Sequence, residues 1–123
     1  MKELSLNAER IKRYRKRRDV VNRIKQDKEN LSDIELQDLV WEAITLFADY
    51  PFHTYRKLRF TYEIRCGEMF INRKDKSITR SSVDIVVGET VRLKWKVAGP
   101  KKLGVFGASY LYPIFRRVGL IDY

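Results

Sequence analysis

The residues from Ser32 to Pro51 limit the possible folds most, because they predict an amphipathic helix with well-marked ends. Ser32 is followed three residues later by Glu35, the spacing of a capping box, in which both side chains bind backbone N–H groups of the first turn. Apolar residues then recur with helical spacing and form one broad face: Leu36, Leu39, Val40, Ala43, Ile44, Leu46, Phe47 and Tyr50. Because such a face is stable only when buried, the segment predicts the central helix of a core.

The opposite face of this expected helix is acidic. It carries Glu35, Asp38, Glu42 and Asp49, and Trp41 is expected to be exposed beside them. A solvated face is the simplest interpretation, because no His or Cys accompanies the carboxylates as a further metal ligand. The alternative is contact with a protein partner, or with a second copy of the chain, through the surface around Trp41 and Glu42.

The charge of the chain is distributed unevenly. The net charge is +10 over 123 residues, with a pI near 9.9. Residues 1–30 contain eleven Lys or Arg and five Asp or Glu. Residues 31–51 contain five Asp or Glu and no Lys or Arg, and residues 52–123 contain fifteen Lys or Arg and six Asp or Glu. A strongly basic chain favours polyanionic partners, of which nucleic acid is the most common. We expect residues 1–30 to form a basic helical arm and residues 31–123 to form a single α+β domain.

The cations of the arm are concentrated in one stretch. Seven of nine consecutive positions are basic: Arg10, Lys12, Arg13, Arg15, Lys16, Arg17 and Arg18. The apolar stripe of this helix is narrow, so the helix buries little surface by itself. Guanidinium groups fit phosphate oxygens, and we therefore expect nucleic-acid contacts from these residues: Arg10, Arg13, Arg15, Arg17 and Arg18. The alternative is a solvated helix that docks on the acidic residues 31–51.

Residues 58–72 predict a β-hairpin. Four apolar residues alternate with polar ones at the period of a half-buried strand: Leu58, Phe60, Tyr62 and Ile64. Cys66 and Gly67 form a two-residue turn, in which glycine readily adopts a positive φ. The implied cross-strand pairs are Tyr62 with Ile71, Ile64 with Met69, Arg65 with Glu68, and Thr61 with Asn72.

Residues 81–97 are compatible with two structures. As a helix, the segment has Ser81 as its N-cap and an apolar arc from Val83 to Leu93. As a second β-hairpin over 83–97, it alternates about Gly88, and its β-branched residues favour strands. The N-cap and the position before a glycine-containing loop and a last helix favour the helix. The two helices then form a helix-turn-helix-like pair, with a connection longer than the usual three or four residues.

The last predicted helix is amphipathic and follows a short basic loop. Its apolar stripe consists of Leu111, Ile114, Phe115 and Val118. Ser109 is the expected N-cap, and Gly119 is expected to end the helix in a left-handed conformation.

The opposite face of this helix carries residue types that can bind nucleic acid. Ser109, Tyr112 and Arg116 are expected to lie on it, with Arg117 beside them, and Lys101 and Lys102 occupy the loop. Because arginine can bond guanine bidentately and lysine can contact phosphates, we interpret the segment as a recognition helix with a phosphate-binding loop. The alternative is a core helix whose arginines are solvated.

The sequence contains little that indicates catalysis. No P-loop, no Gly-x-Gly-x-x-Gly motif and no Cys/His cluster for zinc is present. The only cysteine, Cys66, lies in a predicted turn, and the only histidine, His53, is expected to be a packed side chain. Glu68, which a metal nuclease could use, is expected to pair with Arg65. We therefore expect no enzymatic activity and no cofactor.

The expected location is the cytoplasm. No apolar run approaches the ~18 residues that a membrane span needs, and no signal peptide is predicted. A single cysteine suits a reducing compartment. We expect no association with membranes.

Together these patterns predict an α+β fold with a basic N-terminal helix, a core helix, a β-hairpin and a helix-turn-helix-like pair. The expected function is non-catalytic binding of nucleic acid by a small DNA-binding regulator, with duplex DNA favoured over RNA. One alternative is a binder or inhibitor of RNA or of an RNA–protein complex. The other is a protein-interaction module.

Overall fold

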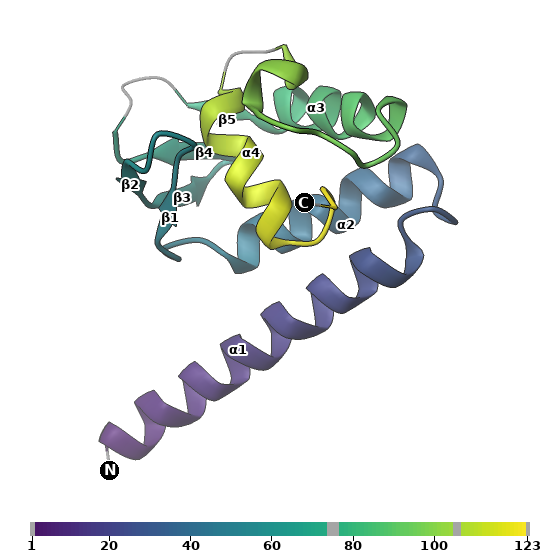
Figure 1. Ribbon diagram of the computed structural model, residues 1–123. Coiled ribbons are helices and arrows are strands. Elements are labelled where there is room, and N and C mark those ends of the chain that lie inside the picture. Colours follow the sequence, from purple (N-terminus) through teal and green to yellow (C-terminus); the bar gives the residue numbers. More distant parts are fainter. Residues whose placement is uncertain (1, 74–76, 105–106, 123) are drawn as a thin grey trace.

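The computed structural model describes residues 2–73, 77–104 and 107–122 and confirms the predicted α+β class. Its helices are α1 (Lys2–Asp27), α2 (Asp33–Leu46), α3 (Arg80–Arg92) and α4 (Ala108–Arg117), with a short 3-10 helix η1 (Pro100–Leu103) before α4. One antiparallel sheet pairs β1 (Phe52–His53) with β2 (Arg59–Phe60), and the other has the order β3 (Tyr62–Arg65), β4 (Glu68–Ile71), β5 (Ile78–Thr79). Figure 1 shows α4 crossing in front of α2.

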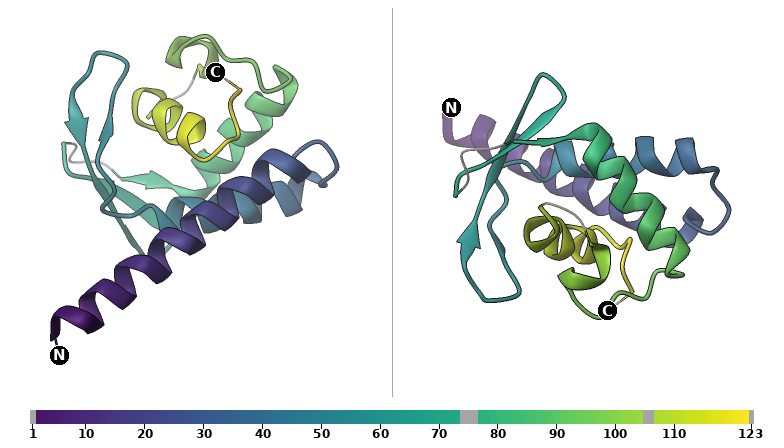
Figure 2. Two further views of the ribbon diagram at one scale, coloured as in Figure 1. Left: turned by 60° about the horizontal axis from the view of Figure 1, so that its bottom comes forward. Right: turned by 90° about the horizontal axis from the view of Figure 1, so that it is seen from above.

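Helix α1 has an exposed N-terminal part and a packed C-terminal part. The side chains of residues 6–16, called the projecting segment below, are all exposed, and the N-terminal part of α1 extends away from the other elements (Figures 1 and 2). Val20, Val21 and Ile24 are buried in the core. The helix is therefore anchored by its C-terminal part, which lies along α2.

Helix α2 forms as the capping pattern predicts. The Ser32 hydroxyl accepts a hydrogen bond from the backbone N–H of Glu35 at 3.2 Å. The predicted apolar face is buried, with Val40 and Ile44 at 0% exposure. At the other end of the helix, two carbonyls without intrahelical partners accept from other elements, the Ile44 carbonyl from the Tyr62 hydroxyl and the Leu46 carbonyl from Arg17.

The hydroxyl of Tyr62 leads to a prediction about alkaline pH. Burial raises the pKa of Tyr62 far above its ordinary value, so the group ionises only in the unfolded state. The stabilisation is complete below the unfolded-state pKa of ~10, and the free energy of unfolding falls above it by up to ~1.4 kcal/mol per pH unit. Tyr62→Phe is expected to be ~1–3 kcal/mol less stable at neutral pH, because the Ile44 carbonyl loses its partner, and to have a shallower alkaline slope. Urea unfolding from neutral to alkaline pH measures both effects.

The exposed residue Tyr14 provides the control for this experiment. Tyr14→Phe removes one tyrosine hydroxyl without removing a buried hydrogen bond, so the stability and the alkaline slope of the parent should be retained. Equal alkaline slopes for Tyr62→Phe and Tyr14→Phe would contradict the assignment.

The register of the predicted hairpin is confirmed. Tyr62 pairs with Ile71, Ile64 with Met69, and Arg65 with Glu68. Beyond the strand end, the N–H of Asn72 donates to the Thr61 carbonyl at 3.1 Å. The turn residues Cys66 and Gly67 both have positive φ, 51° and 73°, as a two-residue hairpin turn requires.

The predicted strand 58–64 is not continuous. Phe60 pairs with Phe52 in the smaller sheet, whereas Tyr62 begins the larger one, so the chain changes partner at Thr61. The short strands β1 and β5 were not predicted, because two residues are too few to show a periodic pattern.

Residues 80–92 form the helix α3, and the hairpin alternative over 83–97 is wrong. Val83, Val86, Val87 and Thr90 are buried along one side of α3, and this tertiary burial outweighs their preference for strands. The predicted N-cap is also wrong, since Thr79 occupies that position and accepts from the N–H of Ser82 at 3.2 Å. Thr79 is the last residue of β5 and has the extended backbone that an N-cap needs, which places Ser81 inside the first turn.

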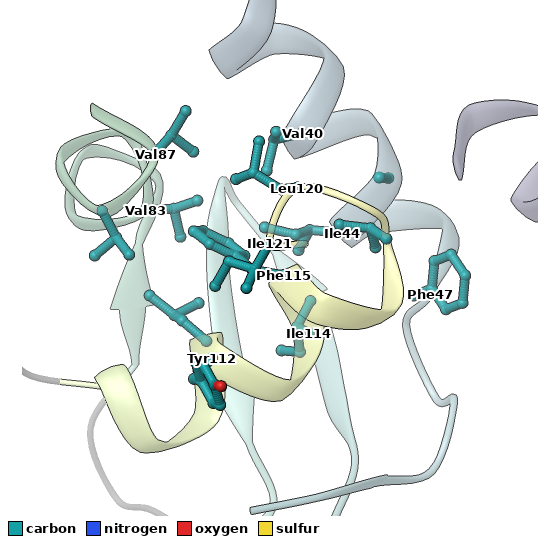
Figure 3. Packing of buried hydrophobic residues seen from close by; sticks show 14 of the residues in the cluster. Val40, Ile44, Phe47, Val83, Val87, Tyr112, Ile114, Phe115, Leu120 and Ile121 are labelled. Carbon is teal, nitrogen blue, oxygen red and sulfur yellow. The ribbon is translucent and has the colours of Figure 1, made fainter. Parts of the chain in front are cut away.

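The apolar stripe of α4 lies in the centre of the molecule. Leu111, Ile114, Phe115 and Val118 are all 0% exposed, which confirms the predicted stripe. Figure 3 shows the Phe115 side chain directed between α2 and α3. Gly119 follows the helix with a φ of 91°, so the predicted left-handed end is also confirmed.

The predicted N-cap and outer face of α4 need correction. Gly107, not Ser109, is the N-cap, with a φ of 85° and no side-chain cap. A Cβ at Gly107 would lie 2.7 Å from the Cδ1 of Ile78, so the close approach of β5 also favours glycine. Tyr112 is buried at 3% exposure, and its hydroxyl donates to the Val97 carbonyl at 3.0 Å. Because α4 also packs against η1 and β1, its buried surface is wider than one stripe.

Candidate nucleic-acid interface

The projecting segment carries most of the accessible cations of α1. Arg10, Lys12, Arg13, Arg15 and Lys16 are exposed in it, and Arg18 is exposed one turn further on. Arg18 contacts the carboxylate of Asp19 at 3.3 Å. In the part of the chain that the structure describes, no ion pair joins α1 to the acidic face of α2. The C-terminal part of α1 nevertheless packs on α2, as the docking alternative expects, and Arg23 lines a hollow with Glu35, Asp38 and Glu42, whereas the cations of the projecting segment remain exposed.

Arg17 differs from its neighbours in the basic stretch. It is half-buried, and its Nε and Nη2 donate to the carbonyls of Leu46 at 2.7 Å and Ala48 at 3.2 Å. A cation is favoured there, because the C-terminal end of α2 carries the negative end of the helix dipole. Burial, followed by repulsion from Arg13, lowers the pKa of Arg17. Arg17 therefore fastens α1 to α2.

Arg117, at the end of α4, lies against the same aromatic rings as Arg17. The guanidinium carbon of Arg17 is 5.2 Å from the centre of the Phe47 ring and 5.4 Å from that of Tyr50. The guanidinium carbon of Arg117 is 5.1 Å and 5.4 Å from the same two centres. The Nε of Arg117 also donates to the Tyr50 hydroxyl at 3.2 Å. Two cations from distant parts of the sequence therefore share one pair of rings.

A cavity of about 340 Å³ lies beside these two arginines. We call it the arginine–tyrosine pocket, and its lining residues are Tyr14, Arg17, Arg18, Val21, Asn22, Tyr50 and Arg117. Sequence reasoning named the three arginines of this pocket as separate candidates but missed Tyr14, Asn22 and Tyr50. No local pattern relates Tyr50 to Arg117, because only the packing of α4 brings them together.

The predicted basic loop lies at the other end of α4. Lys101 and Lys102 are exposed on η1, which packs near the start of α4, whereas Arg117 is at its end. A cavity of about 360 Å³ lies there, lined by Tyr55, Ala98, Gly99, Pro100, Lys101 and Lys102. Ser109 is exposed and lines a neighbouring depression with Lys101. Sequence reasoning missed the exposed residues Tyr55, Arg56 and Lys57 between β1 and β2, although an aromatic followed by two cations was a visible signal.

The predicted site residues on α4 therefore divide between several environments. Arg117 joins the arginines of α1 at the arginine–tyrosine pocket. The guanidinium of Arg116 lies 5.7 Å from the centre of the Tyr112 ring, and that ring contacts Tyr55 edge-to-face at 6.2 Å. Because Tyr112 is buried, it is a core residue and does not present its face to a ligand.

The acidic face of α2 is partly covered. Trp41 is half-buried rather than exposed, so that prediction is wrong, and the Arg80 guanidinium lies 5.7 Å from its ring centre. Arg80 also forms an ion pair with Asp38. Glu35 and Glu42 remain exposed.

The residues considered for catalysis lie in different sheets. Cys66 is exposed in the turn between β3 and β4. His53 is exposed on β1, so the expectation of a packed histidine is wrong. Among the residues that the structure describes, no three His, Cys, Asp or Glu side chains gather as a group that could hold a metal ion.

The helices that the structure describes include no candidate for a membrane span. None of them is both long enough and apolar enough to cross a bilayer.

Comparisons with known proteins add no relative to this picture. The chain matches no protein-family model, no curated protein and no solved structure.

Proposed function

We propose that this protein binds nucleic acid without catalysis, that duplex DNA is its favoured ligand, and that the projecting segment of α1 makes the main contact. The observation that carries the proposal is the cation content of that segment. Its exposed residues include five Lys or Arg and one carboxylate, Glu9, and no described element covers them. We further propose that the protein acts in the cytoplasm as a small regulator.

The distribution of the cations around the helix favours a duplex. A helix turns by about 100° per residue, so the basic residues between 10 and 18 are spread around its whole circumference. A helix lying on a flat anionic surface needs cations on one side only. A helix inside a groove has phosphates on both sides, and an α-helix of ~10–12 Å diameter fits the ~12 Å major groove of B-DNA. The deep, narrow major groove of A-form RNA does not admit such a helix.

The test is the salt dependence of binding by the full chain, measured by fluorescence anisotropy. The first variant replaces Arg10, Arg13, Arg15 and Arg18 by glutamine and leaves Arg17 in place, because Arg17 fastens α1 to α2. If each arginine neutralises one phosphate, the slope of log affinity against log salt should fall by about 0.9 per residue, about 3–4 in all. Affinity for all DNA sequences should fall together.

A second variant with the same change in charge is the control. It replaces Arg56, Lys57, Lys101 and Lys102, at the other end of α4, and should change the slope much less. Equal slopes for the two variants would reject the projecting segment as the interface. Binding to duplex DNA that does not depend on salt would reject the polyanion proposal itself. Tighter binding to RNA of equal length would favour the RNA alternative.

A further inference from the structure

We propose that the arginine–tyrosine pocket receives one unpaired nucleotide, with its phosphate on the arginines and its base on Tyr14. The inference rests on the proposed function and adds to it, since it specifies a duplex end or junction as the preferred ligand. Four observations support it: the size of the cavity, its charge, its fixed donors and its aromatic wall.

The size of the cavity matches a small ligand. Its volume of about 340 Å³ lies at the lower end of the range of ~300–1,000 Å³ that is usual for small-molecule sites. One nucleotide is a ligand of that scale, whereas a stacked base pair is not. The pocket lies between α1, the end of α4 and Tyr50.

The charge of the pocket is positive and has little internal compensation. Arg17, Arg18 and Arg117 line it, and no carboxylate does. Among the described residues, neither Arg17 nor Arg117 forms an ion pair, and both guanidinium groups lie within 5.5 Å of the same two ring centres. Placing like charges together is unfavourable in the free protein, and conflicts of this kind are expected at functional sites. A phosphate group would relieve the repulsion.

The arginine donors are held in place before a ligand arrives. Arg17 is fixed by two carbonyls, and Arg117 is fixed through its Nε by the Tyr50 hydroxyl. Because Arg117 uses only its Nε in that bond, its two terminal nitrogens can donate in parallel to phosphate oxygens. Binding then requires little further ordering of these side chains.

The aromatic wall supplies a surface for a base. Tyr14 is 64% exposed although it lines the pocket, and Asn22 adds an amide that can bond a base edge. Bases stack on aromatic side chains when they are unpaired, but in a duplex both of their faces are already covered. The ligand is therefore an unpaired nucleotide.

The position of the pocket connects it to the projecting segment. Arg18 lines the pocket, and Arg15 of the segment lies on the same helix one turn away. A strand that follows the segment can reach the pocket without leaving the protein surface. A duplex with a single-stranded overhang satisfies both contacts.

The experiment compares three DNA probes with the full chain at one salt concentration: a blunt duplex, the same duplex with a short overhang, and that overhang with abasic sites. The second and third probes carry the same phosphates, so their difference reports the base alone. The parent should bind the normal overhang about tenfold more tightly than the abasic one. Overhangs of both polarities are tested.

Three variants locate the effect. Tyr14→Leu should abolish the difference between normal and abasic overhangs. Arg117→Gln should weaken binding of the overhang about tenfold while affinity for the blunt duplex is retained. Arg116→Gln removes the same charge one residue away, outside the residues that line the pocket, and should retain the preference for the overhang.

The outcomes separate the two proposals. A parent that binds the blunt duplex but treats the normal and abasic overhangs alike would overturn the pocket and leave the proposed function standing. The same follows if Arg116→Gln and Arg117→Gln have equal effects. If the parent does not bind the blunt duplex but does bind the probe with the overhang, the result would overturn the proposed duplex ligand and support the pocket.

Discussion

Replacing Phe115 by alanine is expected to lower the free energy of unfolding by about 3–5 kcal/mol. The side chain is 0% exposed and lies between α2 and α3 (Figure 3). Its removal loses the transfer free energy of the ring and leaves a cavity, because well-packed neighbours relax only in part. Small domains have a total stability of ~5–15 kcal/mol, so this is a large fraction of it. Urea unfolding at neutral pH measures the change.

Two control variants test whether the loss depends on burial of the side chain and on the number of atoms removed. Ile85→Ala removes an apolar side chain that is 63% exposed on α3, and it should cost less than ~1 kcal/mol. Ile114→Val removes one buried methyl group beside Phe115 and should cost ~0.5–1.5 kcal/mol. A loss below 1 kcal/mol for Phe115→Ala would mean that α4 is not the centre of the core.

The parts of the fold that the sequence predicts are those with local signals. Helix α2 has a cap and a long apolar periodicity, and the β3–β4 hairpin has a two-residue turn that determines its register. Both signals lie within a short stretch of chain, and neither depends on distant residues. Residues 83–97 are harder to predict, because their local propensity favours a hairpin whereas tertiary burial favours a helix.

The errors have a common cause in tertiary packing. Tyr112 is one residue beyond the stripe position Leu111, so its burial depends on η1 and β1 covering a second side of α4. His53 and Trp41 were misplaced for the same reason, since their exposure is determined by which elements cover them. Helical periodicity identifies the most buried side of a helix but not the width of its buried surface.

The arginine–tyrosine pocket also depends on tertiary packing that the sequence pattern does not show. Arg17 has the same residue type and surroundings in the sequence as Arg13 and Arg15, and only the position of the end of α2 gives it a different role. Its approach to Arg117 joins residues that are distant in the sequence. The composition could therefore predict a polyanion as ligand, whereas the concave site follows from the arrangement of α1, α2 and α4.

Lys28 is the second residue at which a large effect on stability is expected. It belongs to the basic arm in the sequence but is 6% exposed in the structure. Its Nζ donates to the carbonyls of Gly119 at 3.3 Å and Leu120 at 3.2 Å, pairs with Asp122, and lies 5.0 Å from the centre of the Trp95 ring. The ammonium therefore joins the end of α1 to the residues after α4.

Lys28→Met is expected to lower the free energy of unfolding by about 2–4 kcal/mol, because it leaves two buried carbonyls without a donor. Methionine keeps most of the apolar stem, so the loss reports the ammonium group. Replacing a buried ion pair by apolar residues can be neutral when both partners are replaced. Here the acceptors belong to the backbone and remain polar in any variant, so we expect a net loss, measured by urea unfolding.

Two further variants assign this loss to its source. Lys12→Met makes the same change at an exposed position of α1 and should alter stability by less than ~0.5 kcal/mol. Asp122→Asn removes the charge of a carboxylate that is 47% exposed, and solvent screening should keep its cost below ~1 kcal/mol. If Lys28→Met is as stable as Lys12→Met, water replaces the ammonium at the two carbonyls. If Asp122→Asn costs as much as Lys28→Met, the ion pair rather than the carbonyls holds residues 119–122 against α1.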